Sequence, residues 1–281
     1  MSSVSSIDFL GQPAFRLIAS DGASCVLALH GGHLLSWITP DGIERLYLSP
    51  RSVFDGRTAI RGGVPVCWPQ FNQRGPLAKH GFARNVAWRV DDAAPAATVP
   101  RIALRLDDDA ATRALWPHGF GLRLEATLGA GSLRIALDVR NTGDTAWSFT
   151  GALHSYLRVD DIAAVRLEGL EKARRWDAVC DRHLEEGTDA LTFDTEFDSV
   201  YASPATPLRL AQPSGTLEIA QSASCTETVV WNPGAALAAK LADLPDDGYR
   251  HMLCVEAAAI DNPVHLVPGG QWQGWQQLTV R

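Results

Sequence analysis

An alternation of apolar and polar residues is the feature that most constrains what this chain can fold into. Apolar side chains occupy every second position over 122–128 and again over 133–139, and most positions between them are polar or charged. Successive side chains of a β-strand point to opposite faces, so each run forms a strand with one apolar and one polar face. Gly129-Ala130-Gly131 separates the two runs and permits a turn. The segment therefore predicts an antiparallel hairpin.

Shorter runs of the same kind recur along the chain. Turn residues separate these runs, which lie at 15–18, 24–29, 102–106, 147–158, 208–210, 217–219 and 252–255. The segment 235–244 has apolar residues at helical spacing and predicts a short helix, and residues 91–100 predict a surface loop. Many short strands in one continuous pattern predict an all-β fold, a single domain over residues 1–281 built as a large antiparallel β-sandwich.

Charge and composition exclude several classes of protein. The chain of 281 residues has 25 basic and 32 acidic side chains, and the resulting net charge of −7 argues against a general nucleic-acid-binding surface. No apolar stretch approaches the ~20 residues of a membrane-spanning helix, and the start of the chain lacks the pattern of a secretory signal. The five cysteines are scattered, without metal-ligand or disulfide spacing. We therefore expect a cytoplasmic protein with no membrane or nucleic-acid partner.

A group of cationic residues between positions 59 and 85 stands out in this acidic chain. Arg61, Lys79, His80 and Arg84 lie there among glycines, prolines and aromatic residues. Aromatic rings can stack on a sugar or a base, and arginine binds carboxylate or phosphate through paired hydrogen bonds. The segment is therefore a candidate binding site for an anion. The alternative is a rigid loop whose charges are simply solvated, because loops carry most exposed charge.

Two further candidates for chemistry are His154 and Glu256. His154 lies near the start of a predicted strand, and Glu256 ends the apolar run 252–255. A carboxylate that closes an apolar strand lies either at an exposed edge or in a desolvated site with a function. Histidine exchanges protons near neutral pH, but a lone histidine is more often structural. Composition and spacing do not bring these two residues together.

Other chemistries find little support. The chain contains no Gly-x-Gly-x-x-Gly after a strand, no Gly-x-x-x-x-Gly-Lys-Ser/Thr and no Gly-x-Ser-x-Gly. His30 and His33 would face opposite sides of a strand, which disfavours a metal site there. Trp272 and Trp275 could form a stacking platform, although large aromatic residues are more often core. The charged run 168–175 predicts a solvated face.

Several longer motifs occur in a fixed order along nearly the whole chain. They read GGHLLSW (31–37), IRGGVPVCWP (60–69), HGFAR (80–84), LHSYL (153–157), VWNP (230–233), CVEAA (254–258) and LVPGG (266–270). Together they resemble the motifs of the D-hexose-6-phosphate mutarotases, which belong to the aldose 1-epimerase superfamily. The resemblance implies the galactose mutarotase-like supersandwich, whose concave face holds the sugar, and this agrees with the strand pattern. It implies no metal and no cofactor.

The resemblance also implies roles for individual residues. By position, His154 matches the family's general acid, Glu256 its general base, and Asp198 an aspartate that binds sugar hydroxyls. The residues that match positions lining the sugar and its phosphate are Arg61, Lys79, His80 and Arg84. Lys79 and Ser199 stand where glutamine and arginine are usual. These departures bear on substrate preference and leave the acid/base pair intact.

Anomer interconversion suits these residue types. Opening a sugar ring requires one group to remove the proton of the anomeric hydroxyl and another to protonate the ring oxygen. A protonated histidine can donate near neutral pH, and burial raises the pKa of a glutamate toward that of a more effective base. Arg61 and Arg84 are expected to bind the phosphate, with Lys79 or Arg74 as additional charges.

The expected protein is therefore a monomeric enzyme that interconverts the α and β anomers of hexose 6-phosphates, with glucose 6-phosphate as the expected small-molecule partner. Two alternatives remain open. One is a mutarotase for neutral aldoses such as glucose or galactose, which would use the same acid and base. The other is a non-catalytic carbohydrate-binding protein on the same fold, since a fold does not by itself determine function.

Overall fold

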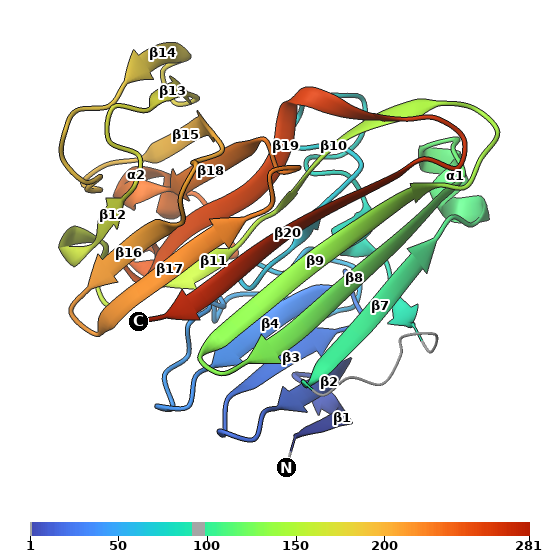
Figure 1. Cartoon of the computed structure of the whole chain (residues 1–281), viewed down its shortest axis with the longest axis horizontal. Coiled ribbons are helices and arrows are strands. Elements are labelled where there is room, and N and C mark those ends of the chain that lie inside the picture. The colour runs from blue at the N-terminus through green and yellow to red at the C-terminus, as the bar shows by residue number, and fades with distance from the viewer. Residues whose placement is uncertain (1, 92–98) are drawn as a thin grey trace.

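Three antiparallel β-sheets form the framework of the protein (Figure 1). The computed structural model describes residues 2–91 and 99–281. Within these residues the α-helices are two short segments, α1 (Ala110–Leu115) and α2 (Gly234–Ala238). No helix in this described part is long and apolar enough to cross a membrane. The all-β prediction is confirmed.

Two of the sheets have eight strands each and pack face to face around the main core. The strands of the first, in chain order, are β6 (Arg89–Val90), β7 (Arg101–Asp107), β8 (Phe120–Gly129), β9 (Ser132–Asn141), β12 (Arg166–Glu168), β16 (Leu208–Gln212), β17 (Gly215–Gln221) and β20 (Gln271–Val280). Those of the second are β5 (Val66–Cys67), β10 (Trp147–Leu153), β11 (Tyr156–Arg158), β13 (Arg174–Asp177), β14 (Arg182–Glu185), β15 (Phe197–Ala202), β18 (Glu227–Asn232) and β19 (Met252–Leu266). The first sheet is ordered β12-β16-β17-β20-β9-β8-β7-β6, and the second β14-β13-β15-β18-β19-β10-β5 with β11 paired to β19.

The predicted hairpin is formed by β8 and β9. The two strands pair in antiparallel register, with Leu124 opposite Leu137, and the apolar positions on this face point into the core. Most of the other predicted runs also fall within strands. The run 24–29 extends one residue beyond β3, and the run 147–158 is divided into β10 and β11 by His154 and Ser155. The predicted helix over 235–244 is shorter, because α2 ends at Ala238 and the chain continues in tight turns toward Pro245. Proline disfavours helical geometry in the residue before it. Residues 92–98 of the predicted loop lie outside the described residues.

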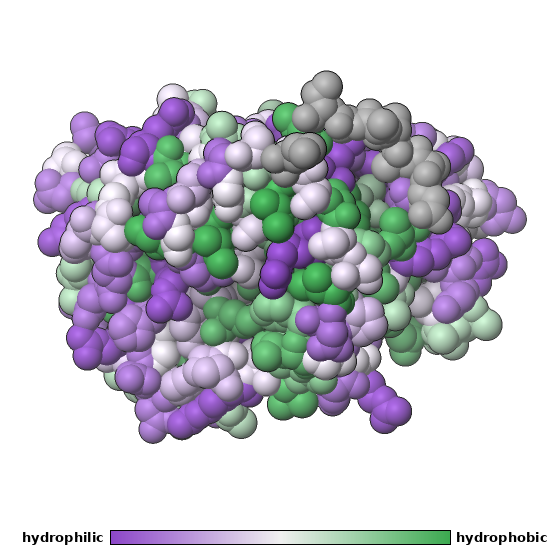
Figure 2. All heavy atoms as spheres, turned by 90° about the horizontal axis from the view of Figure 1, so that it is seen from below, coloured by the Kyte–Doolittle hydropathy of each residue, from purple (hydrophilic) through white to green (hydrophobic). Residues whose placement is uncertain are grey.

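The third sheet contains the N-terminal strands β1 (Ser3–Phe9), β2 (Gln12–Ile18), β3 (Ser24–Ala28) and β4 (His33–Ile38) in sequential order. One face of this sheet contributes Leu17, Leu27 and Leu34 to the main core. Seen from the N-terminal side, the molecule has a mainly hydrophilic surface with apolar residues gathered near the middle of the view (Figure 2).

The two faces of β19 have different environments, which decides where the site lies. Leu253 and Val255 point into the main core between the large sheets. Because side chains alternate along a strand, Cys254 and Glu256 point to the opposite face. There Cys254 packs with Tyr156 and other residues of a separate small cluster. The outer face of this sheet is therefore the face that carries polar and reactive side chains.

The segment 59–85, called the loop 59–85 below, contains the edge strand β5 of this sheet and contributes residues to a pocket on its outer face. Trp68 anchors the loop in the main core. The Trp68 ring is fully buried against several aromatic rings, including Phe82, Phe120 and Trp147. Gly81 has a φ of +70°, and a Cβ there would lie 2.2 Å from the Trp68 carbonyl oxygen. Only glycine fits this close approach, which places the backbone next to His80 against that of Trp68.

His33 anchors the same loop from β4. It is fully buried, and its Nε2 lies 2.7 Å from the carbonyl oxygen of Gly62, while His30 contacts the Thr58 carbonyl oxygen in the same way. The two histidines therefore bind separate backbone groups. Burial lowers the pKa of His33 from 6.5 to about 3, so its imidazole is neutral in the folded protein.

This burial predicts a loss of stability in acid. Below pH 6.5 the unfolded chain binds a proton at His33 while the folded chain does not until about pH 3, so the free energy of unfolding falls as the pH is lowered through this range. The expected contribution is about 1.4 kcal/mol per pH unit. Urea denaturation between pH 6.5 and 5 measures it. His33→Gln should reduce the slope, whereas replacing the exposed His183 should not, and equal slopes for wild type and His33→Gln would refute the linkage.

Candidate active site

The predicted site residues come together in one pocket on the outer face of the second large sheet. The cavity has a volume of about 300 Å³. Its lining includes all seven residues singled out from the sequence, which are Arg61, Lys79, His80, Arg84, His154, Asp198 and Glu256. Segments far apart in the chain therefore converge here: the loop 59–85 and the strands β15 and β19, together with the junction between β10 and β11.

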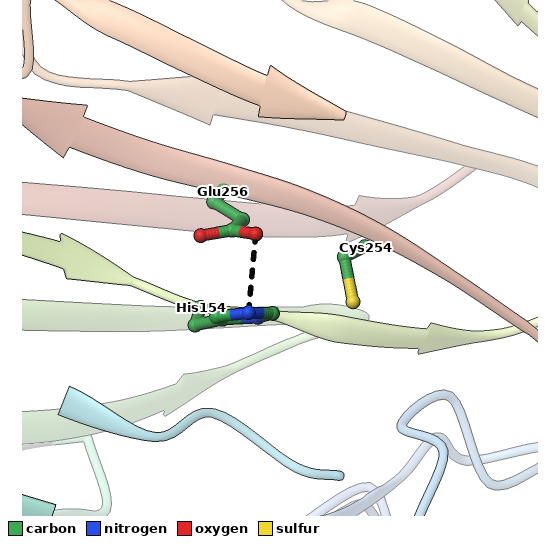
Figure 3. Close-up of side chains that lie close together, drawn as sticks. All are labelled: His154, Cys254 and Glu256. Atoms are coloured by element: carbon green, nitrogen blue, oxygen red, sulfur yellow. Dashed lines mark ion pairs between the residues drawn. The ribbon is translucent and has the colours of Figure 1, made fainter. Parts of the chain in front are cut away.

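His154 and Glu256 face each other and both line the pocket (Figure 3). Nε2 of His154 lies 3.3 Å from Oε1 of Glu256. The strands β10 and β19 are adjacent and pair Leu153 with Ala257, which sets the two side chains side by side. His154 directly follows β10 and lies two residues before the start of β11, which agrees with its predicted place near the start of a strand. The prediction that Glu256 closes its strand is wrong, because Glu256 lies within β19.

Burial perturbs both members of this pair. It raises the pKa of Glu256 well above its usual value, and the charge of Asp198 acts in the same direction. It lowers the pKa of His154 well below 6.5, and the nearby His80 and Arg84 lower it further. The neutral form of the pair is therefore favoured in the free protein. The expected protonated imidazole is not the resting state of His154, because a charged ring is poorly solvated at this depth.

Aromatic rings hold the imidazole of His154 in place. The ring of Tyr156 stacks on it with a centroid separation of 4.8 Å and an interplanar angle of 7°. His80 and Trp231 contact it edge to face. Burial and the nearby cations lower the pKa of His80 to about 2, so this second imidazole is neutral and borders the pair without adding charge.

Arg61 is in the pocket but its guanidinium is already bound. Asp243 accepts hydrogen bonds from Nε and Nη2 of Arg61, each at 3.1 Å. The hydroxyl of Tyr156 accepts a further bond from Nη1 at 2.9 Å. The paired edge of Arg61, expected to bind phosphate, instead binds Asp243. Arg61 therefore fixes Tyr156, and through Tyr156 the ring of His154.

Arg84 and Lys79 are the cations with free capacity at the pocket. Arg84 donates from Nη2 to the carbonyl oxygen of Lys79 at 3.0 Å, and its buried Nε has no hydrogen-bond partner among the described residues. Lys79 is exposed. Arg74, the other expected charge, forms an ion pair with Asp261 at 2.8 Å and covers the ring of Trp176. Arg84 and Lys79 are thus the groups placed to meet an anion.

Asp198 projects from β15 and lines the pocket. Burial raises its pKa to about 6, although Lys79 partly offsets the effect. The neighbouring Ser199 faces the other way and is fully buried, and its hydroxyl accepts a 2.6 Å hydrogen bond from Arg175. Arg175 also pairs with Asp177 and Glu186, so the prediction of a solvated face is wrong for this member of the run 168–175.

Comparison with known proteins identifies the family. Residues 13–279 match the model of the family described as aldose 1-epimerase. The chain belongs to the aldose 1-epimerase family. It is therefore an enzyme of the isomerase class, and the resemblance read from its motifs is confirmed.

Two relatives and one solved structure agree with this assignment to the family. The chain is 38% identical over 258 residues to a "putative glucose-6-phosphate 1-epimerase" of Cenchrus ciliaris, with 88% of this chain and 78% of the relative covered. It is 38% identical over 236 residues to a protein of the same name from Escherichia coli, with coverages of 82% and 78%. The crystal structure of a "putative mutarotase" from Salmonella typhimurium superposes with a TM-score of 0.89 at 31% identity, covering 99% of this chain and 93% of the other.

Sequence reasoning gave no role to several residues in or beside the site. Tyr156 and Trp231 line the pocket and lie inside recognised motifs, and their aromatic character was the available signal. Cys254 lies next to the acid/base pair but outside the pocket lining, and its spacing from the other cysteines gave no signal of a site. No sequence pattern indicated a role for Asp243, because its partner Arg61 is 182 positions away in the chain.

The two tryptophans considered as a stacking platform do not take part in the pocket. Trp272 packs on the core, and Trp275 lies under the guanidinium of Arg134.

Proposed function

We propose that this epimerase interconverts the α and β anomers of hexose 6-phosphates, with glucose 6-phosphate as the principal substrate. The observation that carries the proposal is the buried His154–Glu256 pair, 3.3 Å apart, in the same pocket as the unpaired Arg84 and Lys79. The pair supplies an acid and a base, and the cations supply a binding site for a phosphate. The names of the relatives point to the same substrate.

The reaction depends on one exchangeable proton that either His154 or Glu256 can hold. In the sugar-bound state that begins ring opening, His154 carries the proton and Glu256 is ionised. Glu256 takes the proton of the anomeric hydroxyl while His154 donates to the ring oxygen, and the bond between C1 and the ring oxygen breaks to leave an aldehyde. Rotation about the C1–C2 bond presents the other face, and the reverse transfers close the ring. General acid and general base catalysis contribute roughly 10²–10⁴-fold each.

Burial of the pair favours the ring-opening step. Opening the ring converts a charged pair into a neutral one, since His154 loses its proton and Glu256 gains one. The same burial that lowers the pKa of His154 and raises that of Glu256 stabilises this neutral product. The low-dielectric pocket thus disfavours the charged starting pair relative to the open-chain state. Asp198, on the other side of the pocket, is placed to bind sugar hydroxyls.

Anomer exchange followed by NMR tests the proposal directly. Catalytic amounts of protein are added to glucose 6-phosphate and, in parallel, to glucose, and the spontaneous rate of each sugar is subtracted. Faster exchange of the phosphate alone is the expected result. Equal acceleration of both sugars would indicate a mutarotase for neutral aldoses, and binding without acceleration would indicate a carbohydrate-binding protein.

We also propose that the chain acts as a monomeric single domain over residues 1–281 in the cytoplasm. The main core includes residues from all three sheets, which supports one cooperative unit. The five cysteines are free, as is usual in a reducing compartment. Light scattering of the purified protein and a single thermal unfolding transition would support these assignments. A dimer mass or two transitions would contradict them.

A further inference from the structure

The thiol of Cys254 lies beside the acid/base pair and has no part in the proposed reaction (Figure 3). One ligand atom each from His154, Cys254 and Glu256 lies within 4.8 Å of the other two. Cys254 and Glu256 are two positions apart on β19, so their side chains leave the strand on the same face. Tyr156 pairs with Cys254 across β11 and β19, and this pairing brings the preceding His154 alongside.

Two polar atoms of this group are buried and lack hydrogen-bond partners in the described structure. They are Nδ1 of His154 and Oε2 of Glu256, in side chains whose residues are 7% and 1% exposed. Most buried polar atoms in proteins are hydrogen-bonded, and exceptions often mark a site for an ion, a water or a ligand. The group thus combines an imidazole, a thiol and a carboxylate that are not committed to the surrounding protein.

This combination of ligand atoms suits zinc. Zinc binds nitrogen, sulfur and carboxylate oxygen with bonds of about 2.0–2.3 Å, which in a tetrahedral site places ligand atoms roughly 3.3–3.8 Å apart. Nε2 of His154 and Oε1 of Glu256, which are 3.3 Å apart, already meet this requirement, and the unpartnered Nδ1 and Oε2 are the other polar atoms of the same two side chains. The Cys254 sulfur has to approach by roughly 1 Å, which is within reach of rotation about its side-chain bond. Magnesium and calcium prefer ligand sets made of oxygen alone and do not fit.

We propose that zinc binds His154, Cys254 and Glu256 and inhibits the enzyme by occupying its acid and its base together. On binding, zinc displaces the protons of the Cys254 thiol and the Glu256 carboxyl group to the solvent. The ion held by one thiolate and one carboxylate then has no net charge, so the nearby Lys79 and Arg84 do not repel the assembled site strongly. Three protein ligands leave a fourth position for water on the open side of the pocket. This inference rests on the proposed function for the loss of activity, whereas the binding of the metal is independent of it.

The test combines activity with a spectroscopic measurement on the full-length protein. Zinc chloride is titrated into the anomer exchange assay, and exchange should stop when the site fills and return when EDTA is added. Cobalt(II) replaces zinc for absorption spectroscopy, because a thiolate ligand gives an intense charge-transfer band in the near ultraviolet. Wild-type protein should show this band. Its absence would overturn the proposal, even if the protein proved inactive on every sugar.

Cysteine variants locate the metal. Cys254→Ala should keep exchange in the absence of zinc, lose the cobalt band and require at least 10–100-fold more zinc for inhibition, since loss of even an outer partner of a metal ligand has an effect of this size. Cys254→Ser, which is nearly isosteric, serves the same purpose if the alanine variant does not fold. The matched controls are Cys25→Ala, a buried thiol in β3, and Cys180→Ser, an exposed thiol. Unchanged zinc inhibition in both Cys254 variants, or its loss in Cys180→Ser, would overturn the site.

Discussion

Glu256→Gln is expected to slow the exchange of glucose 6-phosphate anomers by about 10²–10⁴-fold while leaving sugar-phosphate binding largely intact. The glutamine amide has nearly the same shape as the carboxylate but cannot accept the anomeric proton. Glu256 is 1% exposed, so water cannot readily replace it as the base. The substitution also removes the ionised form that the reaction requires, while Arg84 and Lys79 remain in place. Exchange NMR measures the rate, and calorimetric titration with glucose 6-phosphate measures binding.

The matched control for this prediction is Glu227→Gln. Glu227 is also a buried glutamate of the same sheet, but it accepts a hydrogen bond from the Ile260 backbone and does not line the pocket. This variant should exchange anomers at close to the wild-type rate under conditions where both proteins are folded. If Glu256→Gln remained active, the carboxylate would not be the base. If both variants lost binding as well as activity, the cause would be structural.

The strand pattern made the fold predictable from the sequence. The alternation in β8 and β9 determined both their type and their register, because a shift by one residue would move Leu124 and Leu137 out of the core. The functional pair was not predictable in this way. His154 and Glu256 are neighbours only because β10 pairs with β19, and that long-range pairing leaves no periodic signal in either strand. Family motifs alone linked the two residues before the structure did.

The partners of the charged residues could not be predicted either. Arg61, Arg84 and Arg175 look alike in sequence, yet Arg61 is bound by Asp243, Arg175 pairs with Asp177, and Arg84 has an Nε without a hydrogen-bond partner in the described part of the chain. Which carboxylate meets which guanidinium depends on loop conformation. The same holds for the pKa of His154, since the motif LHSYL does not show that its histidine is buried, with only 7% exposed.

Free donor capacity at Arg84 leads to the second large expected effect. Arg84→Ala should lower kcat/KM for glucose 6-phosphate by about 10–100-fold, because charge-assisted hydrogen bonds contribute roughly 1.5–3 kcal/mol and each 1.4 kcal/mol is a factor of ten. Exchange of glucose should change far less, since a neutral sugar has no phosphate to lose. Both sugars are measured with the same enzyme preparation by exchange NMR.

Arg74→Ala provides the comparison that isolates charge at the pocket from charge near it. Arg74 belongs to the same loop but pairs with Asp261 and does not line the pocket, so its removal should change kcat/KM little for either sugar.

Lys79→Ala should lower kcat/KM for glucose 6-phosphate as Arg84→Ala does, but by a smaller factor, because the exposed ammonium is better screened by solvent. Equal losses on glucose and glucose 6-phosphate in Arg84→Ala would show that the arginine supports the site without binding phosphate. The specificity would then have to come from Lys79, and the double variant would reveal it as a further loss confined to the phosphorylated sugar.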